Sequence, residues 1–181
     1  KPDDAVKKLT YWKEERMKWH WSLGLNKDHL RLRQHEPDER AHYAADSWDI
    51  EYEYPDWGFK ELEGIANRTD YDLKNHSKFS GRNLAYMDPE TNESYYPYII
   101  EPSVGVSRLF LALLIDSYKE EPARNATHNV AGGEKRVVLA LKPSLAPIKV
   151  AVFPLVSNKP ELMDKAQTVY RMLKKRFVTA W

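Results

Sequence analysis

The sequence has no cysteine among its 181 residues. This absence excludes disulfide bonds and thiolate ligands. The six histidines show no spacing typical of paired metal ligands, so we expect no structural zinc. No apolar run approaches the roughly 20 residues that a membrane-spanning helix needs. No signal-peptide pattern opens the chain, and we therefore expect a cytoplasmic protein without a membrane partner.

An excess of charge of either sign is also missing. Lysine and arginine number 28, aspartate and glutamate number 27, and the formal net charge is +1. Such a balance is typical of soluble domains and gives no strong basic field for RNA, although a local patch could still bind it. The six Trp and eleven Tyr are many for this length, and their regular spacing favours packing over a base-stacking surface.

Hydrophobic periodicity predicts a mixture of helices and antiparallel strands over the first two thirds of the chain. Apolar side chains recur at three- and four-residue steps in some segments and alternate with polar ones in others. The predicted elements are a helix over residues 4–22, strands over 30–33, 47–54, 59–65 and 95–100, and a helix over 107–118. A tight turn at Pro55–Gly58 should make the strands on either side of it an antiparallel pair.

The last third of the chain differs in composition. Residues 119–134 are mostly polar and include a Gly-Gly pair, so we expect them to be irregular. A strand over 136–141 precedes an almost wholly apolar strand over 148–156, whose two faces we expect to be covered. A helix beginning near Pro160 carries an apolar stripe that we expect to be buried. The sequence ends where a second strand should follow this helix, and without that strand we expect the apolar face of the strand–helix unit to be poorly covered. The basic residues near its end favour a solvated helix terminus over an RNA contact; they are Arg171, Lys174, Lys175 and Arg176.

The most informative segment is Glu101-Pro102-Ser103-Val104-Gly105-Val106-Ser107-Arg108, between a predicted strand and a predicted helix. The carboxylate of Glu101 and the hydroxyl of Ser103 can hold a small ammonium group, and Gly105 permits close approach of the backbone. Arg108 can reach an anionic group near the start of the helix. A site that takes both a cation and an anion suits an amino acid being joined to a nucleotide. Taken alone, however, a Glu-Pro-Ser sequence is more often a strand-ending turn.

Two carboxylates on the predicted strand over 59–65 form a second candidate site. Side chains alternate along a strand, so we expect Glu61 and Glu63 on one face. Hard cations take carboxylate oxygens, and these two glutamates could hold Mg²⁺ together with nucleotide phosphates. A solvated strand face is the alternative interpretation.

The segment Glu101–Arg108 resembles motif 3 of the class II aminoacyl-tRNA synthetases. Other segments narrow the resemblance to the homodimeric glycyl-tRNA synthetases, and together they extend over nearly the whole chain. They are His42-Tyr43-Ala44 before Trp48-Asp49-Ile50, Glu61 to Leu73 followed by His76, and Leu145-Ala146-Pro147-Ile148-Lys149-Val150. Motif 3 alone would indicate only the class, whereas these segments in this order indicate the glycine enzymes.

The resemblance implies specific site residues. The glycine-contacting positions would be Glu101, Pro102, Ser103, Val104 and Gly105, where Glu101 holds the ammonium group and Ser103 assists. The ATP-contacting positions would be Glu61, Leu62, Gly105, Val106, Ser107 and Arg108. No separate catalytic residue is assigned. Arg68, Asp70 and Asp72 match the family without assigned roles, and pairing of Arg68 with a carboxylate is the simplest expectation.

The resemblance also implies an α+β fold. Residues 1–120 would be the C-terminal part of the class II antiparallel-sheet catalytic core, including motif 3. Residues 121–142 would be a linker and a strand, and residues 143–181 the truncated start of an α/β anticodon-binding domain. The implied activity is ATP-dependent activation of glycine to glycyl-adenylate, with Mg²⁺, and transfer of the glycyl group to tRNA-Gly. The implied parent enzyme is a homodimer.

Two further class II signatures, motifs 1 and 2, are not found in the chain. Motif 2 would supply the arginine that clamps the α-phosphate of ATP, so we expect the chain alone to be inactive as a ligase. The alternative from another functional class is a non-catalytic synthetase-like binding module or accessory subunit. Retention of Glu101, Ser103 and Arg108 favours the enzyme, because a pure binding module need not keep them.

Overall fold

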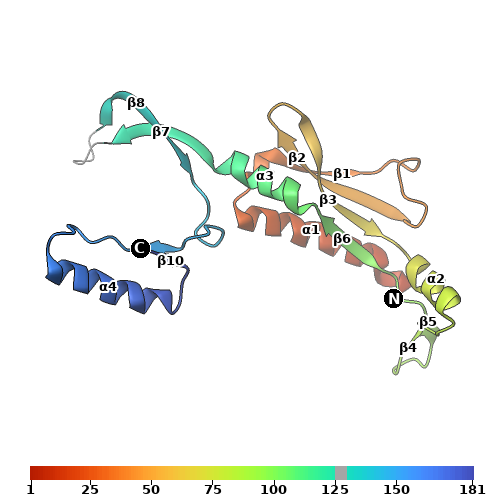
Figure 1. Cartoon of the computed structure of the whole chain (residues 1–181). Helices are drawn as coiled ribbons and strands as arrows, with labels where there is room; N and C mark the ends of the chain where they lie inside the picture. The colour runs from red at the N-terminus through yellow and green to blue at the C-terminus, as the bar shows by residue number, and fades with distance from the viewer. Residues whose placement is uncertain (125–129) are drawn as a thin grey trace. The chain divides into compact units, whose positions relative to one another are not determined.

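The computed structural model describes residues 1–124 and 130–181. The described chain divides into two compact units, Lys1–Tyr118 and Lys119–Trp181. Figure 1 shows the helices and strands of both units in chain order. No helix in the described ranges combines the length and the apolarity that crossing a membrane requires.

The first unit is built around a four-stranded antiparallel sheet of order β1-β2-β3-β6. Its strands are β1 (Leu30–Gln34), β2 (Asp46–Tyr54), β3 (Gly58–Asn67) and β6 (Ile100–Val104). Its helices are α1 (Ala5–Leu23), α2 (Tyr71–Ser80) and α3 (Val106–Ser117), with 3₁₀ turns η1 (Pro2–Asp4) and η2 (Lys27–His29). A small ribbon follows α2 and consists of β4 (Tyr86–Met87) and β5 (Ser94–Tyr95). This mixture confirms the α+β class.

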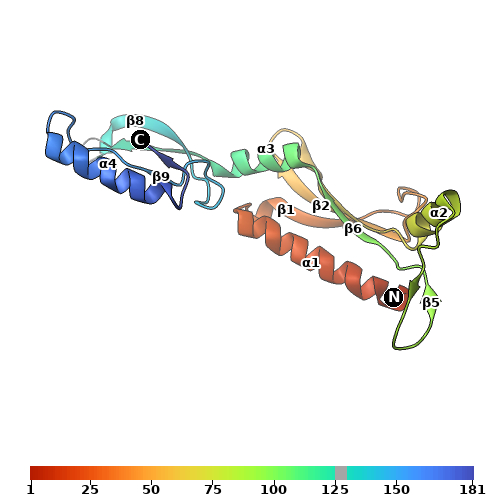
Figure 2. The same cartoon turned by 60° about the horizontal axis from the view of Figure 1, so that its bottom comes forward.

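The core of the first unit lies between α1 and one face of the sheet (Figure 2). Alternation along β2 sends Ile50, Tyr52 and Tyr54 toward this face, where each is at most 3% exposed. Leu9 and Met17 of α1 belong to the same buried cluster. The apolar side chains on one face of α1 therefore pack in the same core as every second side chain of β2, as the helical and strand patterns of the sequence predict.

The first helix is confirmed close to its expected bounds. The sequence predicts a helix over residues 4–22, and α1 covers Ala5–Leu23. Gly24 follows with a left-handed φ of 110°, and its N–H donates to the carbonyl oxygens of His20 and Trp21. Glycine adopts this conformation without the cost that a Cβ would impose, so it ends the helix cleanly.

The strand expected over residues 95–100 is wrong in its position. β5 ends at Tyr95, and β6 begins only at Ile100 and continues through Val104. Pro97 has no N–H to donate to a ladder and interrupts the strand pattern. The N–H of Ile99 donates to the carbonyl oxygen of Thr69 at 2.9 Å and anchors the entry into β6. The acidic start of the candidate motif therefore lies within a paired strand rather than beyond its end.

The second unit contains more strand than expected. β7 (Tyr118–Arg124) and β8 (Val130–Leu139) form a two-stranded sheet. β9 (Val150–Ala151) pairs in parallel with β10 (Thr179–Ala180), and α4 (Pro160–Lys174) connects them in the chain. The expectation of irregular structure over 119–134 is therefore wrong for residues 119–124 and 130–134. The rest of that segment, residues 125–129, lies outside the described residues.

The apolar segments of the second unit are less buried than expected. The strand predicted over 148–156 is reduced to β9, and Phe153 and Leu155 are 74% and 88% exposed. The apolar stripe of α4 is at best half-buried, and no residue of this helix is buried. The predicted covering of both strand faces is thus wrong for the described chain, and the exposure agrees with the poor covering expected of the strand–helix unit.

Candidate functional site

A hollow of about 350 Å³ lies on the face of the sheet opposite α1, which we call the outer face. Strand register explains which side chains gather there, because Gly64 of β3 lies opposite both Asp49 of β2 and Ser103 of β6, and Ala66 lies opposite Glu101. We call this space the acidic hollow. Its polar lining includes Asp49, Glu61, Arg68, Glu101, Ser103, His35, Glu39 and Ser47.

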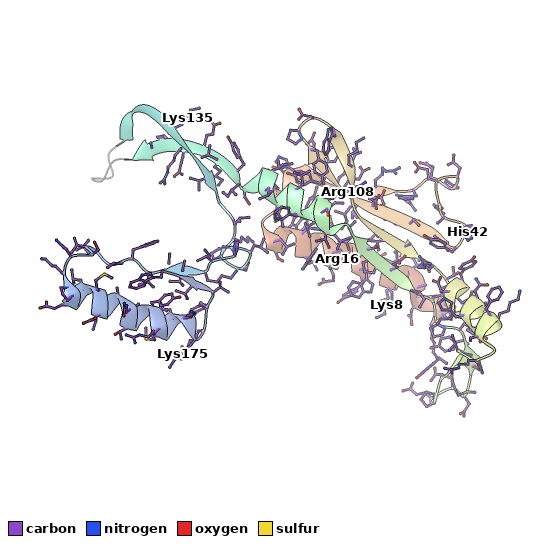
Figure 3. All side chains as sticks on the ribbon, viewed as in Figure 1. Lys8, Arg16, His42, Arg108, Lys135 and Lys175 are labelled. Atoms are coloured by element: carbon purple, nitrogen blue, oxygen red, sulfur yellow. The ribbon has the colours of Figure 1, made fainter. Side chains whose placement is uncertain are left out.

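A second hollow of about 390 Å³ lies where β6 passes into α3. We call it the arginine hollow, because Arg108 in the first turn of α3 is the only cationic residue among the described residues that line it (Figure 3). Its lining consists of Glu61, Leu62, Ser103, Val104, Gly105, Val106, Ser107 and Arg108. All predicted ATP-contacting residues are therefore brought together at one place.

Arg108 is held by the backbone of β3. Its Nη1 donates to the carbonyl oxygen of Glu61 at 2.7 Å and lies 3.6 Å from the carboxylate Oε2 of the same residue. The Tyr54 hydroxyl donates to the carbonyl oxygen of Arg108 at 3.2 Å, which anchors the start of α3 to β2. Among the described residues, the Nη2 and Nε of Arg108 have no hydrogen-bond acceptor, and the side chain is 57% exposed. A guanidinium with free donors suits an anionic ligand.

Glu101 is oriented by Arg68. The Nη1 of Arg68 donates to Oε2 of Glu101 at 2.7 Å, while its Nε and Nη2 bind both oxygens of Asp72 at 2.7 and 2.8 Å. The guanidinium also stacks on the ring of Tyr43 at 4.0 Å. The expected pairing of Arg68 with a carboxylate is confirmed. No hydrogen bond to Oε1 of Glu101 occurs within the described chain, and the side chain is 42% exposed, so this oxygen is available to a ligand.

The same contacts shift the pKa values of Arg68 and Asp72. The hydrogen bonds to Asp72 and Glu101 raise the pKa of the Arg68 guanidinium above its ordinary value. The hydrogen bond from Arg68 lowers the pKa of the Asp72 carboxyl below its ordinary value. Arg68, which orients Glu101, is therefore permanently charged, and its partner Asp72 is charged near neutral pH.

Glu101 and Arg108 do not line the same hollow. Glu101 lines the acidic hollow and Arg108 lines the arginine hollow, and the two hollows share Glu61 and Ser103. Pro102 lines neither, because it lies opposite Ile65 and alternates away from Glu101 and Ser103. The two sites predicted from the sequence are thus adjoining rather than identical.

The expectation that Glu61 and Glu63 share a strand face is wrong. A β-bulge interrupts the pairing of β2 with β3, so that Glu63 lies opposite Ile50, Glu61 lies opposite Glu51, and Leu62 is the extra residue. An extra residue reverses the alternation beyond it. Glu61 consequently lies on the outer face, while Glu63 points toward α1 and is fully buried.

Glu63 does not fit a magnesium site. Its carboxylate accepts hydrogen bonds from Nε and Nη2 of Arg16, and Oε2 also lies 2.7 Å from Nε2 of the buried His20. Burial raises the pKa of Glu63, but the hydrogen bonds from His20 and Arg16 outweigh it, and the net shift is downward. Both oxygens are occupied and inaccessible to a cation. Within the described chain, no three His, Asp or Glu residues are grouped to hold a metal ion.

The sequence did not single out Asp49, His35 or Gly64 as site residues. The Asp49 side chain is 9% exposed, with Nε2 of His35 at 2.8 Å and Nη2 of Arg33 at 3.6 Å. The histidine contact lacks the alignment of a hydrogen bond, so both ring nitrogens of His35 are buried without a hydrogen-bond partner among the residues that the structure describes. The alternation of Asp49 with Trp48 and Ile50 indicated a polar face, but only the packing of α1 shows which face holds the hollow.

Comparison with known proteins gives a consistent result. The chain is 48% identical to a glycine–tRNA ligase of Caldanaerobacter subterraneus over 177 residues, which is 98% of this chain and 36% of the relative. It is 49% identical to a glycine–tRNA ligase of Thermobifida fusca over 171 residues, which is 92% of this chain and 36% of the relative. The chain thus spans about a third of the length of these curated relatives. No family model matches it.

A solved structure is also similar in fold. It is the Giardia lamblia prolyl-tRNA synthetase in complex with prolyl-adenylate, with a TM-score of 0.56 and 22% identity over 98% of this chain and 32% of that chain. The antiparallel sheet followed by the motif at β6 and α3 therefore has the fold of the class II aminoacyl-tRNA synthetases. Within that class, the curated relatives that the chain matches over nearly its whole length are glycine–tRNA ligases.

Proposed function

We propose that the chain provides the glycine- and ATP-binding part of a glycine–tRNA ligase. One observation carries the proposal: the acidic hollow that contains Glu101 and the arginine hollow that contains Arg108 adjoin through Glu61 and Ser103. A ligand that spans both hollows would carry an ammonium group at one end and a phosphate at the other, as an aminoacyl-adenylate does.

In the proposed first step, glycine binds through its ammonium group to Oε1 of Glu101, with the hydroxyl of Ser103 beside it. A carboxylate oxygen of glycine attacks the α-phosphorus of ATP, the bond to the β-phosphate oxygen breaks, and pyrophosphate leaves. Arg108 would follow the phosphate charge with its free Nη2 and Nε donors. A hydroxyl of the terminal ribose of tRNA-Gly then attacks the glycyl carbonyl and releases AMP.

Magnesium fits the site through Glu61 alone. Mg²⁺ in nucleotide sites is held by one or two carboxylates and the substrate phosphates. The Glu61 side chain is 55% exposed and lines both hollows, so it can offer an oxygen to an ion carried in by ATP. The bound ion would neutralise phosphate charge during the displacement.

The remaining parts of the proposal concern the larger assembly. Residues 1–120 would belong to the class II catalytic core, a division close to the boundary between the two compact units. Residues 121–142 would be a linker and a strand, and residues 143–181 would begin the anticodon-binding domain of an enzyme that acts on tRNA-Gly. The parent enzyme would be a cytoplasmic homodimer. The similarity to glycine–tRNA ligases over 98% of the chain supports the assignment of both units to such an enzyme.

The test is calorimetric titration of the chain with glycyl-sulfamoyl adenosine, a stable analogue of glycyl-adenylate. We expect saturable binding, and we expect Glu101→Gln to weaken it roughly tenfold to a hundredfold, because a hydrogen bond to a charged group contributes about 1.5–3 kcal/mol. The alanyl and prolyl analogues serve as controls and should bind more weakly than the glycyl analogue.

Two results would contradict the proposal. Equal binding of the glycyl and alanyl analogues would remove the glycine assignment and leave a less selective nucleotide site. Absence of binding of every analogue would favour a non-catalytic module that has kept the fold without the ligand.

A further inference from the structure

Behind the bulge of β3 lies a buried ionic cluster that the proposed chemistry does not use. Glu63 and His20 are both 0% exposed, and the Arg16 side chain of α1 is 20% exposed (Figure 3). Two hydrogen bonds from Arg16 and one from His20 converge on the two oxygens of Glu63. Nδ1 of His20 is buried without a hydrogen-bond partner among the described residues. A buried ion pair is weak evidence for stability, because desolvation of both charges opposes their attraction.

The cluster is joined to the arginine hollow through the backbone of the bulge. The two residues before Glu63 use their carbonyl oxygens to hold the motif at α3. The Glu61 carbonyl oxygen accepts from Nη1 of Arg108 at 2.7 Å, and the Leu62 carbonyl oxygen accepts from the N–H of Gly105 at 3.2 Å. The direction of both carbonyl groups depends on the extra residue in β3.

We propose that Glu63, held by Arg16 and His20, is a positioning residue that fixes the bulge of β3 and thereby the placement of Arg108 and Gly105 in the arginine hollow. A regular strand at this point would turn one of the two carbonyl groups away from α3, because successive carbonyl groups point to opposite strand edges. In the bulged register, the side chain of Glu63 faces α1 and pairs with Arg16 and His20. This register is favoured because it leaves no buried charge without a partner. The nucleotide part of this inference rests on the proposed function, whereas the backbone part does not.

The experiment compares the 181-residue chain with Glu63→Gln and with a matched control, Asp116→Asn. Asp116 is also a buried carboxylate, 4% exposed, near the end of α3. It binds Nδ1 of His29 and the hydroxyl of Tyr52 at 2.7 Å each, rather than Arg16 or His20. Both variants remove one buried charge, so they should lose similar stability. Only Glu63→Gln should alter the arginine hollow.

The first measurement needs no ligand. Amide hydrogen exchange, followed by NMR, reports how often the hydrogen bond from the N–H of Gly105 to the carbonyl oxygen of Leu62 opens. We expect the Gly105 amide to exchange at least about tenfold faster in Glu63→Gln than in Asp116→Asn, since local opening is governed by local contacts. Equal Gly105 exchange in the two variants overturns the inference. If Glu63→Gln fails to fold, Arg16→Lys takes its place, because lysine keeps the charge but loses the paired geometry. We expect an intermediate increase in the exchange rate of the Gly105 amide in this variant.

The second measurement is the Kd for ATP. We expect it to rise about tenfold in Glu63→Gln and to stay within about twofold in Asp116→Asn, because small displacements of a phosphate-binding group are costly. An unchanged Kd in Glu63→Gln with fast Gly105 exchange would overturn the link to the nucleotide. If the unmodified chain does not bind ATP, the proposed function fails, and the exchange measurement still decides whether Glu63 positions the motif.

Discussion

At the scale of single residues, Arg68 has the most demanding geometry in the acidic hollow. It binds Asp72 with two donors, Glu101 with a third, and stacks on Tyr43. Lysine offers one charge and no fork, so it cannot make these contacts together. We predict that Arg68→Lys weakens binding of the glycyl-adenylate analogue about tenfold by calorimetry, since Glu101 loses its orientation.

Arg31→Lys is the control for that prediction. Arg31 also binds a carboxylate, Oε2 of Glu51 at 2.6 Å, and stacks on the ring of Phe59 at 3.9 Å, yet it lines neither hollow. Its replacement should change analogue affinity by less than about twofold, a change within the usual effect of a surface substitution. If both substitutions weaken binding equally, orientation of Glu101 is not the reason.

Glu63 also predicts a pH dependence of stability. Its pKa in the folded protein is lowered from an ordinary value of 4.5. The folded state therefore binds this proton less tightly than the unfolded chain, and the stabilisation is complete above pH 4.5 and lost as the pH falls through the folded pKa. We predict that the free energy of unfolding in urea falls less steeply below about pH 4.5 in Glu63→Gln than in the unmodified chain. Identical slopes would show that Glu63 titrates normally.

At the scale of elements, β3 forms the floor of the acidic hollow, and Gly64 lies at its centre. A Cβ at this position would meet Oε1 of Glu61 at 3.7 Å and Oδ1 of Asp49 at 3.8 Å, which are ordinary contact distances. We predict that Gly64→Ala stabilises the chain by about 0.5–1 kcal/mol, because glycine is unfavourable within a strand. The same substitution should weaken analogue binding, because the methyl group occupies the hollow.

The control on the same strand is Gly58→Ala. Gly58 has a φ of +64°, and no heavy atom of the described chain outside its immediate neighbours lies within 4 Å of the added Cβ. Here alanine should destabilise the chain by about 1 kcal/mol through backbone strain and leave binding unchanged. Thermal unfolding and calorimetric titration of Gly64→Ala and Gly58→Ala measure stability and analogue binding. A loss of stability in Gly64→Ala would contradict the prediction for this position.

At the scale of the whole molecule, every candidate site residue belongs to the unit Lys1–Tyr118. This unit also contains the complete four-stranded sheet and the buried cluster around Ile50 and Leu9. A unit with its own core and site should not need the rest of the chain to bind a small ligand. We predict that residues 1–118 alone bind the glycyl-adenylate analogue within about threefold of the 181-residue chain, a difference below 1 kcal/mol.

Calorimetry on both lengths, with circular dichroism as a control for folding, tests this prediction. A folded unit 1–118 that does not bind the analogue would show that residues 119–181 contribute to the site. The exposed Phe153 and Leu155 of the second unit give no reason to expect such a contribution, because exposure alone identifies no ligand.

Local patterns predicted several elements and failed where distant segments intervene. The helix over 4–22, the strand over 47–54 and the helix over 107–118 have strong periods, and α1, β2 and α3 lie close to these bounds. The strand over 95–100 and the irregular segment over 119–134 were wrong, because Pro97 interrupts the first and strand pairing orders the described parts of the second.

The order of residues was sufficient to determine the α+β class and the contiguous motif from Glu101 to Arg108, because periods and motifs are properties of neighbouring residues. Only the tertiary structure decided that Glu63 belongs to the core and Glu61 to the site, and that Glu101 and Arg108 line adjoining hollows. The physical reason is that a bulge and a sheet register depend on contacts with α1, β2 and β6, which lie far away in the chain.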